Sequence, residues 1–392
     1  MQVRSEVRKM KRPDIKVLHT CPLGTGGITS MVLNTCDHLN REKINFDYLV
    51  YRNQVEYNEW RAVALGGKKI VADNEGASRG AGRFLKKMIN TFIAVKKEDE
   101  DIFHINASSP YDSLVGIAAK AAGIKKVIVH SHNANNSNKN PAWLLVNKMC
   151  KVIMPLYTDC YLTCSTEAAD FMFPKRVFEK KQFYYIHNGI EINKFEFNYE
   201  VRERIRKELN IENRFVVGHV GRFFKQKNHE FLIDIMNTLI KKEPNAVLLL
   251  IGIGELQDSI KKKVIESGIE DKVIFFGASD NVNELLQAMD VFVMTSFHEG
   301  LPVVGVEAQA AGLPCIFSDT IAHEVNISGS VEFLSLKNDS TYWADKVINS
   351  KANNLERRKN ADRVRSAGYD IQSTADDLTN IYYSLMRKGE IL

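Results

Sequence analysis

Short apolar runs alternate with helical patterns along the whole chain. In the first half the runs lie at residues 15–20, 46–51, 101–107, 125–132 and 160–165, and in the second half at 214–222, 246–252, 272–277, 290–296 and 314–319. The segments between them show helical periodicity, most clearly the stretches that begin at Arg83 and at Pro141. Strands that alternate with helices predict an α/β fold, in which parallel sheets carry helices on both faces.

A charge-dense segment at residues 191–211 interrupts this alternation. Because 392 residues exceed a single ordinary core, we predict two doubly wound, Rossmann-like domains that face each other across a cleft. The expected domains are residues 1–197 and 198–369. The amphipathic stretch 370–392 is expected to pack back on the first domain. Ligand sites in such domains lie at the carboxyl ends of the strands.

Composition narrows the class of protein. A hydrophobic content of 44% and a charged content of 26% are typical of globular proteins. No apolar run approaches the roughly 18–20 residues that span a bilayer. The basic N-terminus lacks the apolar core of a secretory signal. The six cysteines form no CxxC pair, which favours reduced thiols and a cytoplasmic protein.

Charge is distributed unevenly between the two halves. Residues 1–197 carry 29 Lys and Arg against 20 Asp and Glu, a net charge of +9, whereas residues 198–392 carry 24 against 28, a net charge of −4. The basic half would suit a phosphate-bearing acceptor or peripheral contact with an anionic membrane. Ordinary solvated lysines explain the charge equally well. The basic residues are not interleaved with aromatic side chains, so a nucleic-acid partner has little support.

The most informative stretch is SFHEGLPVVGVEAQAAGLPCIFSD, residues 296–319. It contains Glu299 in a short loop and Glu307 within the helix that follows. Pro302 suits the first position of that helix, where free amides favour an anion such as phosphate. We therefore expect this stretch to hold a sugar nucleotide, with Glu307 on the nucleoside and Glu299 near the sugar.

Two further strand ends in the second half carry candidate binding residues. The first strand ends in Gly221 and Arg222, and Lys227 follows after a short loop. This pair of cations would suit a diphosphate, the alternative being solvated surface charges. Gly277 ends another strand, and the loop after it could close over a nucleobase through backbone groups.

The first strand of the chain leads through Gly24, Gly26 and Gly27 into a helix. Glycines there allow close backbone approach to a ligand, although a plain tight turn is nearly as good an interpretation. A strict dinucleotide fingerprint would need a third glycine where Thr29 stands, so this loop does not match an NAD site.

Histidines and carboxylates complete the set of candidates in the first half. His130 and His132 end a strand on one face, and we assign a substrate contact to His132, with a structural histidine as the alternative. No third metal ligand is near in sequence. Asp99 and Asp101 match a DxD pattern, but they belong to a charge run before a strand, which predicts a solvated turn.

Together these motifs resemble the family 4 glycosyltransferases with the GT-B fold. The resemblance rests on Gly26 with Gly27, His132, the spacing of Arg222 and Lys227, and the seven residues between Glu299 and Glu307, with the continuation EAQAAGLP. It extends over essentially the whole chain and is densest at residues 214–325. Within the family it is most similar to bacterial exopolysaccharide and capsule transferases.

The resemblance implies roles for these residues. Glu307 would bind the ribose hydroxyls, and Arg222 and Lys227 the diphosphate. Glu299, with the backbone at Gly300 and Leu301, would hold the transferred sugar. His132 would assist from the other domain. Members of the family retain the anomeric configuration without a metal ion or other cofactor, and the leaving phosphate is usually proposed to accept the proton of the acceptor.

Two departures from the family pattern occur. Ile186-His187-Asn188-Gly189 stands where many relatives have PNG, and Ile321-Ala322-His323 stands where they have a glycine pair before Glu324. The second departure leaves the donor sugar open.

We therefore expect a retaining, metal-independent glycosyltransferase. It would move a hexose-type sugar from a nucleotide sugar to a lipid-linked oligosaccharide acceptor, and the donor expected first is a UDP-sugar. A sugar-nucleotide epimerase of the same fold and a non-catalytic sugar-nucleotide-binding scaffold are the alternatives.

Overall fold

The computed structural model describes residues 12–24, 26–73, 81–132, 140–179, 182–350 and 354–387. By its internal contacts the chain divides into two compact units. Unit 1 comprises residues 1–187 and 372–392, and unit 2 comprises residues 188–371. No helix in the described ranges combines the length and the apolar character needed to cross a membrane.

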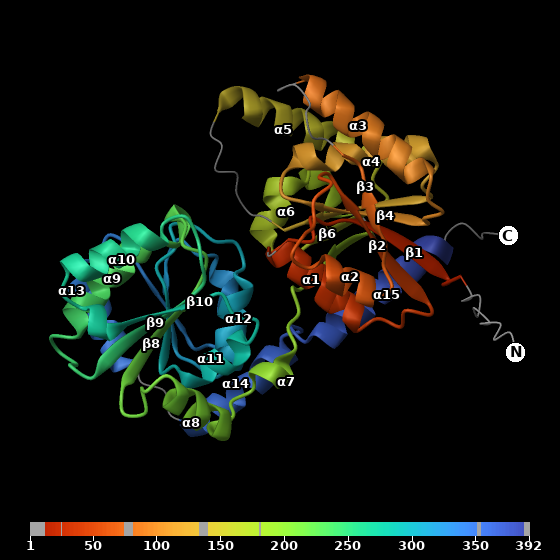
Figure 1. The fold of residues 1–392 in the computed structure, drawn as a ribbon. Coiled ribbons are helices and arrows are strands. Elements are labelled where there is room, and N and C mark those ends of the chain that lie inside the picture. Colours follow the sequence, from red (N-terminus) through yellow and green to blue (C-terminus); the bar gives the residue numbers. More distant parts are fainter. Residues whose placement is uncertain are drawn as a thin grey trace, which may run out of the picture. The chain divides into compact units, whose positions relative to one another are not determined.

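Unit 1 is built on a parallel sheet with the strand order β3-β2-β1-β4-β5-β6-β7 (Figure 1). Its strands are β1 Ile15–Thr20, β2 Ile44–Val50, β3 Lys69–Val71, β4 Ile102–Ala107, β5 Lys126–Ser131, β6 Cys160–Thr163 and β7 Phe183–Tyr185. The strands expected near β1, β2, β4, β5 and β6 are confirmed. The two edge strands, β3 and β7, were not expected, because three residues are too few to show a period.

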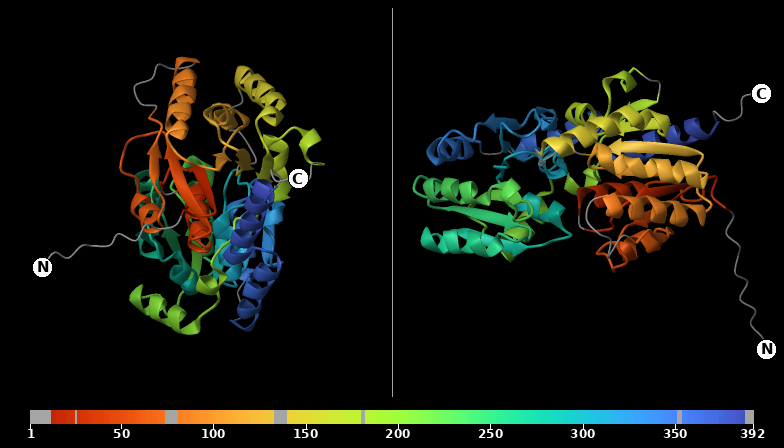
Figure 2. Two further views of the ribbon diagram at one scale, coloured as in Figure 1. Left: turned by 90° about the vertical axis from the view of Figure 1, so that its right-hand side faces the viewer. Right: turned by 90° about the horizontal axis from the view of Figure 1, so that it is seen from above.

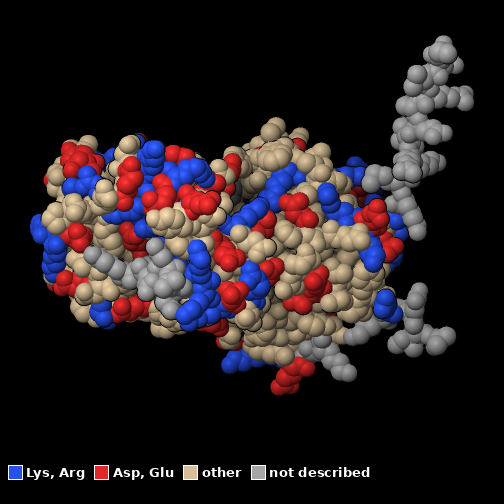
Figure 3. All heavy atoms as spheres, turned by 90° about the horizontal axis from the view of Figure 1, so that it is seen from below, with Lys and Arg blue, Asp and Glu red and all other residues tan. Residues whose placement is uncertain are grey.

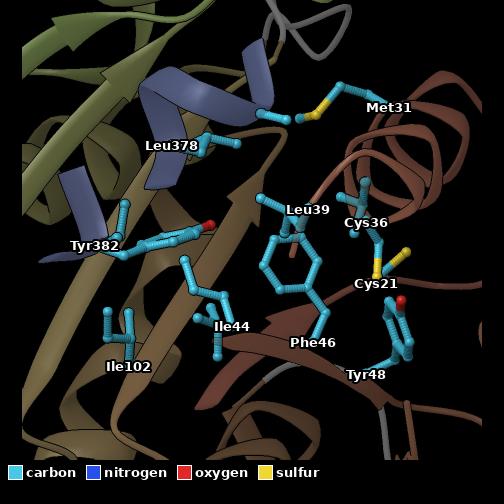
Figure 4. Close-up of a cluster of buried hydrophobic side chains, with 14 of the residues drawn as sticks. Cys21, Met31, Cys36, Leu39, Ile44, Phe46, Tyr48, Ile102, Leu378 and Tyr382 are labelled. Atoms are coloured by element: carbon cyan, nitrogen blue, oxygen red, sulfur yellow. The ribbon is translucent and has the colours of Figure 1, made fainter. Parts of the chain in front are cut away.

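Helices cover both faces of this sheet (Figure 2). They are α1 Gly27–Asp37, α2 Glu59–Ala64, α3 Ala81–Lys96, α4 Val115–Ala122, α5 Pro141–Ile153, α6 Thr166–Met172 and α15 Ile371–Arg387. The helix α15 comes from the other end of the chain, and its Leu378 and Tyr382 point into the core beside Phe46 (Figure 4). The C-terminal helix thus completes the core of unit 1.

Unit 2 contains a parallel sheet with the order β10-β9-β8-β11-β12-β13. Its strands are β8 Phe215–Val220, β9 Ala246–Ile251, β10 Val273–Gly277, β11 Val291–Met294, β12 Cys315–Ser318 and β13 Val331–Leu334. The five expected strands are confirmed, and the short edge strand β13 is additional. Two doubly wound parallel sheets, as the alternation predicted, are therefore present.

The helices of unit 2 also lie on both faces of its sheet (Figure 1). They are α7 Ile192–Phe195, α8 Tyr199–Glu208, α9 His229–Leu239, α10 Gln257–Glu266, α11 Val282–Ala288, α12 Val303–Ala310, α13 Ser340–Asn349 and α14 Asn354–Ser366. The short helix α7 contacts α11, α12 and α14. Residues 188–197 consequently belong to unit 2, although the charge pattern had placed a boundary after them.

The DxD triplet is not the solvated turn that its charge suggested. Glu100 and Asp101 are buried, and Asp101 forms ion pairs with Lys125 at 2.6 Å and with Arg12 at 3.2 Å. It also accepts a hydrogen bond from the Lys16 amide at 3.0 Å. The carboxylate joins the starts of neighbouring strands, and its role is structural.

Gly312, which follows α12, provides a test of how tightly unit 2 is packed. Its φ is +72°, and a Cβ there would lie 2.4 Å from the Cα of Arg357. Gly329 has a similar φ of +77° but no atom within 4 Å of a Cβ position. We expect Gly329→Ala to lower the free energy of unfolding by about 1 kcal/mol through backbone strain alone. Gly312→Ala should cost more than about 3 kcal/mol, because backbone must also move.

Chemical denaturation of both variants, followed by circular dichroism, measures this difference. Equal destabilisation by the two substitutions would contradict the close packing of α14 on the end of α12.

Candidate functional site

In unit 2 three adjacent strands end in glycines that bring their loops close together. The strands β8, β9 and β10 end at or just before Gly221, Gly252 and Gly277. The Gly252 amide donates to the Gly277 carbonyl at 2.8 Å, and a Cβ on Gly252 would lie 2.2 Å from the Gly221 carbonyl oxygen. A side chain at position 252 is thus excluded, which lets the backbone of the three loops approach closely at this edge of the sheet.

The structure brings Lys227 and Glu299 together at the same edge. The Lys227 ammonium lies 2.7 Å from Oε1 of Glu299, and the side chains are only 18% and 13% exposed. The Phe297 amide donates to the Gln226 carbonyl, and the Gln226 side chain donates to the His298 carbonyl. These bonds tie the loop before α9 to the loop that carries Glu299, so the ion pair has a defined position.

Glu307 lies on α12, in a largely buried helix. Burial raises the pKa of its carboxyl group to about 7. No hydrogen bond or ion pair of the Glu307 side chain occurs among the described residues, and none joins it to Glu299. A carboxyl group held in this way, partly buried and without a protein partner, is suited to accept hydrogen bonds from a ligand.

The remaining predicted residues of unit 2 lie around this pair. Arg222 is exposed, with its guanidinium group 4.9 Å from the centre of the Phe224 ring. Leu301 is buried in a small core with Val306 and Ile190, and it anchors the loop that contains Gly300. Pro302 precedes α12 as its N-cap instead of occupying the first helical position, a difference of one residue. The free amides of the first turn are unaffected.

In unit 1 the predicted glycines and histidine lie at the carboxyl ends of β1 and β5. Gly26 is the N-cap of α1 and Gly27 is its first residue. Neither has an atom within 4 Å of a Cβ position, so space remains beside both. His132 follows the end of β5, and its ring centre lies 4.1 Å from that of His130.

The tertiary structure surrounds His132 with partners that the sequence analysis missed. His19 and His104 are opposite each other in the pairing of β1 with β4, and their rings stack at 4.4 Å. His104 bonds to His130 at 3.2 Å and to the Tyr382 hydroxyl at 2.8 Å. The recurrence of a histidine near the end of each of three strands was the available signal. Burial lowers the pKa of all four imidazoles, that of His132 to about 3, so they are neutral near pH 7.

Asn106 determines the tautomer of His132. The Asn106 amide nitrogen donates to the Thr20 carbonyl at 3.1 Å, which fixes the orientation of the amide group. Its oxygen therefore faces Nε2 of His132 at 2.9 Å. Because a carboxamide oxygen only accepts, Nε2 carries the proton and Nδ1 is left as an acceptor.

Comparisons with known proteins identify the family of this chain. The family model described as "Glycosyl transferases group 1" matches residues 201–368. The chain is 31% identical to the "Putative glycosyltransferase EpsF" of Bacillus subtilis (strain 168), over 94% of this chain and 96% of that protein. The chain belongs to the group 1 glycosyltransferases.

This glycosyltransferase is also similar to a second curated enzyme and to a solved structure. It is 26% identical to the Escherichia coli UDP-Gal:alpha-D-GlcNAc-diphosphoundecaprenol alpha-1,3-galactosyltransferase, over 77% of this chain and 80% of that enzyme. The crystal structure of Anabaena Alr3699/HepE in complex with UDP-glucose has a TM-score of 0.74 at 17% identity, covering 94% of this chain and 100% of that one. The structural likeness supports the GT-B fold class.

Unit 1 of this glycosyltransferase also contains a cavity of about 480 Å³ at the carboxyl ends of β1, β2 and β4. Its lining includes Ile28, Tyr51, Arg52, Lys87, Asn106 and Asp112. The Lys87 ammonium lies 4.4 Å from the centre of the Tyr51 ring. Because Asn106 also bonds to His132, one residue connects the cavity wall to the histidine cluster.

We predict that Asn106→Asp raises the pKa of His132. A carboxylate at this position would stabilise the imidazolium form, whereas the amide stabilises only the neutral Nε2–H tautomer. Asn106→Leu is the matched control, because it removes the acceptor without adding charge and should leave the pKa low. Two-dimensional NMR of the imidazole nitrogens during a pH titration measures both. The same His132 pKa in the two variants would contradict the assignment.

Proposed function

We propose that this glycosyltransferase moves a hexose-type sugar from a UDP-sugar to a lipid-linked saccharide in the synthesis of an exopolysaccharide or capsule. The names of its relatives support these substrates. The Escherichia coli relative is named for UDP-Gal and a diphosphoundecaprenol acceptor, and another, CapH of Staphylococcus aureus, for capsular polysaccharide biosynthesis. The observation that carries the proposal is the Lys227–Glu299 pair at the glycine-rich strand ends of unit 2.

The donor would occupy the strand ends of unit 2. Gly277, which has no atom within 4 Å of a Cβ position, leaves room for the nucleotide against the backbone, and Glu307 accepts hydrogen bonds from the ribose hydroxyls. Arg222 and Lys227 hold the diphosphate, while Glu299 holds the sugar with the amides near Gly300. The contact between Lys227 and Glu299 is consistent with these two roles. The diphosphate bound by Lys227 and the sugar bound by Glu299 are joined at the anomeric carbon, so their binding residues should lie close together.

Departure of the diphosphate creates negative charge, which Lys227, Arg222 and the free amides at the start of α12 would stabilise. These groups supply the positive charge that a divalent cation supplies in other transferases, and we propose a reaction that needs no metal ion. The departing phosphate oxygen accepts the proton of the acceptor hydroxyl on the same face of the sugar. The new bond then has the configuration of the old one, and Glu299 serves to position the sugar.

The acceptor would bind in unit 1. The cavity beside β1, β2 and β4 combines aliphatic and aromatic walls with two cations and carboxylates, a lining suited to a hydroxylated saccharide. His132, neutral and with Nδ1 free to accept, would bond to a sugar hydroxyl.

Transfer assays test the proposal directly. With a panel of sugar nucleotides and a polyprenyl-diphosphate-linked saccharide, we expect transfer in excess EDTA and a product with the anomeric configuration of the donor, determined by NMR. Lys227→Ala should lower kcat by roughly 10²–10³, as expected for loss of a charge-stabilising group. Lys225→Ala, an exposed lysine in the same turn, is the matched control and should leave kcat unchanged.

Loss of transfer on chelation, restored by added Mg²⁺ or Mn²⁺, would overturn the metal-free reaction. Conversion of the donor with no acceptor present would favour an epimerase, and binding without turnover would favour a scaffold.

The raised pKa of Glu307 predicts a pH dependence of donor binding. Below pH 7 the carboxyl group is protonated in the free protein, and above it the carboxylate can accept two charge-assisted hydrogen bonds. The affinity for UDP-glucose should therefore rise from pH 6 to pH 8, by up to about tenfold. Glu307→Gln should weaken binding and remove the dependence. Isothermal titration calorimetry measures both, and a wild-type affinity that is constant over this range would contradict the ribose assignment.

A further inference from the structure

Two helices of unit 1, α3 and α5, expose apolar side chains in regular stripes. The exposed apolar residues are Leu85, Ile89, Phe92 and Ile93 on α3, and Leu144, Leu145, Val146, Met149, Val152, Ile153 and Leu156 on α5 and the turn after it. Within these sets, Leu85, Ile89 and Phe92, and likewise Leu145, Met149, Val152 and Leu156, recur three or four positions apart, which places each series along one side of its helix. Leu145, Met149 and Val152 are 59%, 61% and 60% exposed, and Leu156 is 85% exposed.

The two helices are linked through one turn of unit 1, and we call their exposed apolar side chains together the α3–α5 face. The Tyr111 ring, in the turn Pro110–Leu114, contacts Phe84 of α3 at 5.3 Å and Trp143 of α5 at 5.1 Å. Asn147 of α5 accepts a hydrogen bond from the Tyr111 amide at 3.1 Å. Since one aromatic side chain packs against both helices, the turn Pro110–Leu114 holds α3 and α5 in a fixed arrangement within unit 1.

The charges on the two helices are all of one sign. Arg83, Lys86, Lys87 and Lys96 lie on α3, and Lys148 and Lys151 on α5, whereas neither helix contains Asp or Glu. Arg176 adds a further cation by donating to the Val152 carbonyl near the end of α5. In contrast, the face of the molecule in Figure 3 has Lys and Arg interspersed with Asp and Glu.

We propose that the α3–α5 face binds an anionic lipid surface. Apolar side chains of this size lower the free energy when they enter the boundary between headgroups and acyl chains, and lysines beside them reach lipid phosphates with flexible stems. Each cation near an anionic surface adds to the attraction. The face combines both requirements on one rigid surface.

The charge also argues against a second copy of the chain as the occupant. A symmetric pair would bring the same cations of both copies together, with no carboxylate on either helix to compensate. An anionic bilayer provides the opposite charge and the apolar interior at once. Binding of this kind does not depend on the proposed transfer reaction.

Co-sedimentation of the full-length protein with vesicles tests the inference. We expect binding to phosphatidylcholine vesicles that contain phosphatidylglycerol, weaker binding at high salt, and much weaker binding to phosphatidylcholine alone. Leu145→Ser, Met149→Ser and Val152→Ser combined should reduce the partition coefficient by about tenfold or more. Lys86→Glu with Lys148→Glu should reduce it for the anionic vesicles only.

Matched controls come from exposed residues of unit 2. Ile253→Ser with Ile265→Ser removes apolar side chains that are 57% and 61% exposed, and Lys241→Glu with Lys337→Glu makes the same charge change away from the face. Both controls should bind as the wild type does. Equal binding of the α5 variant and the wild type would overturn the inference. So would a concentration-dependent dimer, measured by light scattering, that the α5 variant abolishes.

Discussion

The structure depends on one property of parallel sheets, which is that all their strands end at the same edge. Backbone groups beyond the last ladder bond need partners, and the loops there are free to supply ligand contacts instead. In unit 2 this edge carries Gly221, Gly277, Lys227 and Glu299, and in unit 1 it carries Gly26 and His132. Within each unit, residues far apart in sequence are brought to the same edge because the sheet imposes one direction on every strand.

The polar groups at the strand ends of unit 1 and unit 2 differ in charge. In unit 1, burial keeps His19, His104, His130 and His132 neutral, so the histidine cluster is a polar network without net charge. In unit 2 the Lys227–Glu299 pair is charged and only slightly exposed, and Glu307 titrates near neutral pH. A neutral imidazole cluster is suited to hydrogen-bond hydroxyl groups, whereas a lysine in a charged pair is suited to bind an anion.

The helix α3 links two features of unit 1. Its Lys87 reaches the cavity at the strand ends, while Leu85 and Ile89 belong to the α3–α5 face. A saccharide carried by a membrane lipid would need a headgroup site and a lipid-facing surface on the same rigid element. The arrangement of α3 meets that geometric requirement within one helix.

The alternation of apolar runs and helices determined the two-sheet architecture, because a parallel strand buried on both faces must be apolar along its length. The motif at residues 296–319 and the spacing of Arg222 and Lys227 indicated the chemistry, since close backbone approach and paired cations require particular residue types. Edge strands such as β3 and β13 were missed, because they are short and Lys69 and Glu332 interrupt their apolar runs. The burial of Asp101 was also missed, because local charge does not reveal the Lys125 and Arg12 that neutralise it. Tertiary structure alone decided that Asn106 orients His132 and that α15 supplies Tyr382 to the histidine cluster. Both depend on side chains that come from different strands, or from opposite ends of the chain, and that meet only when the sheet has formed.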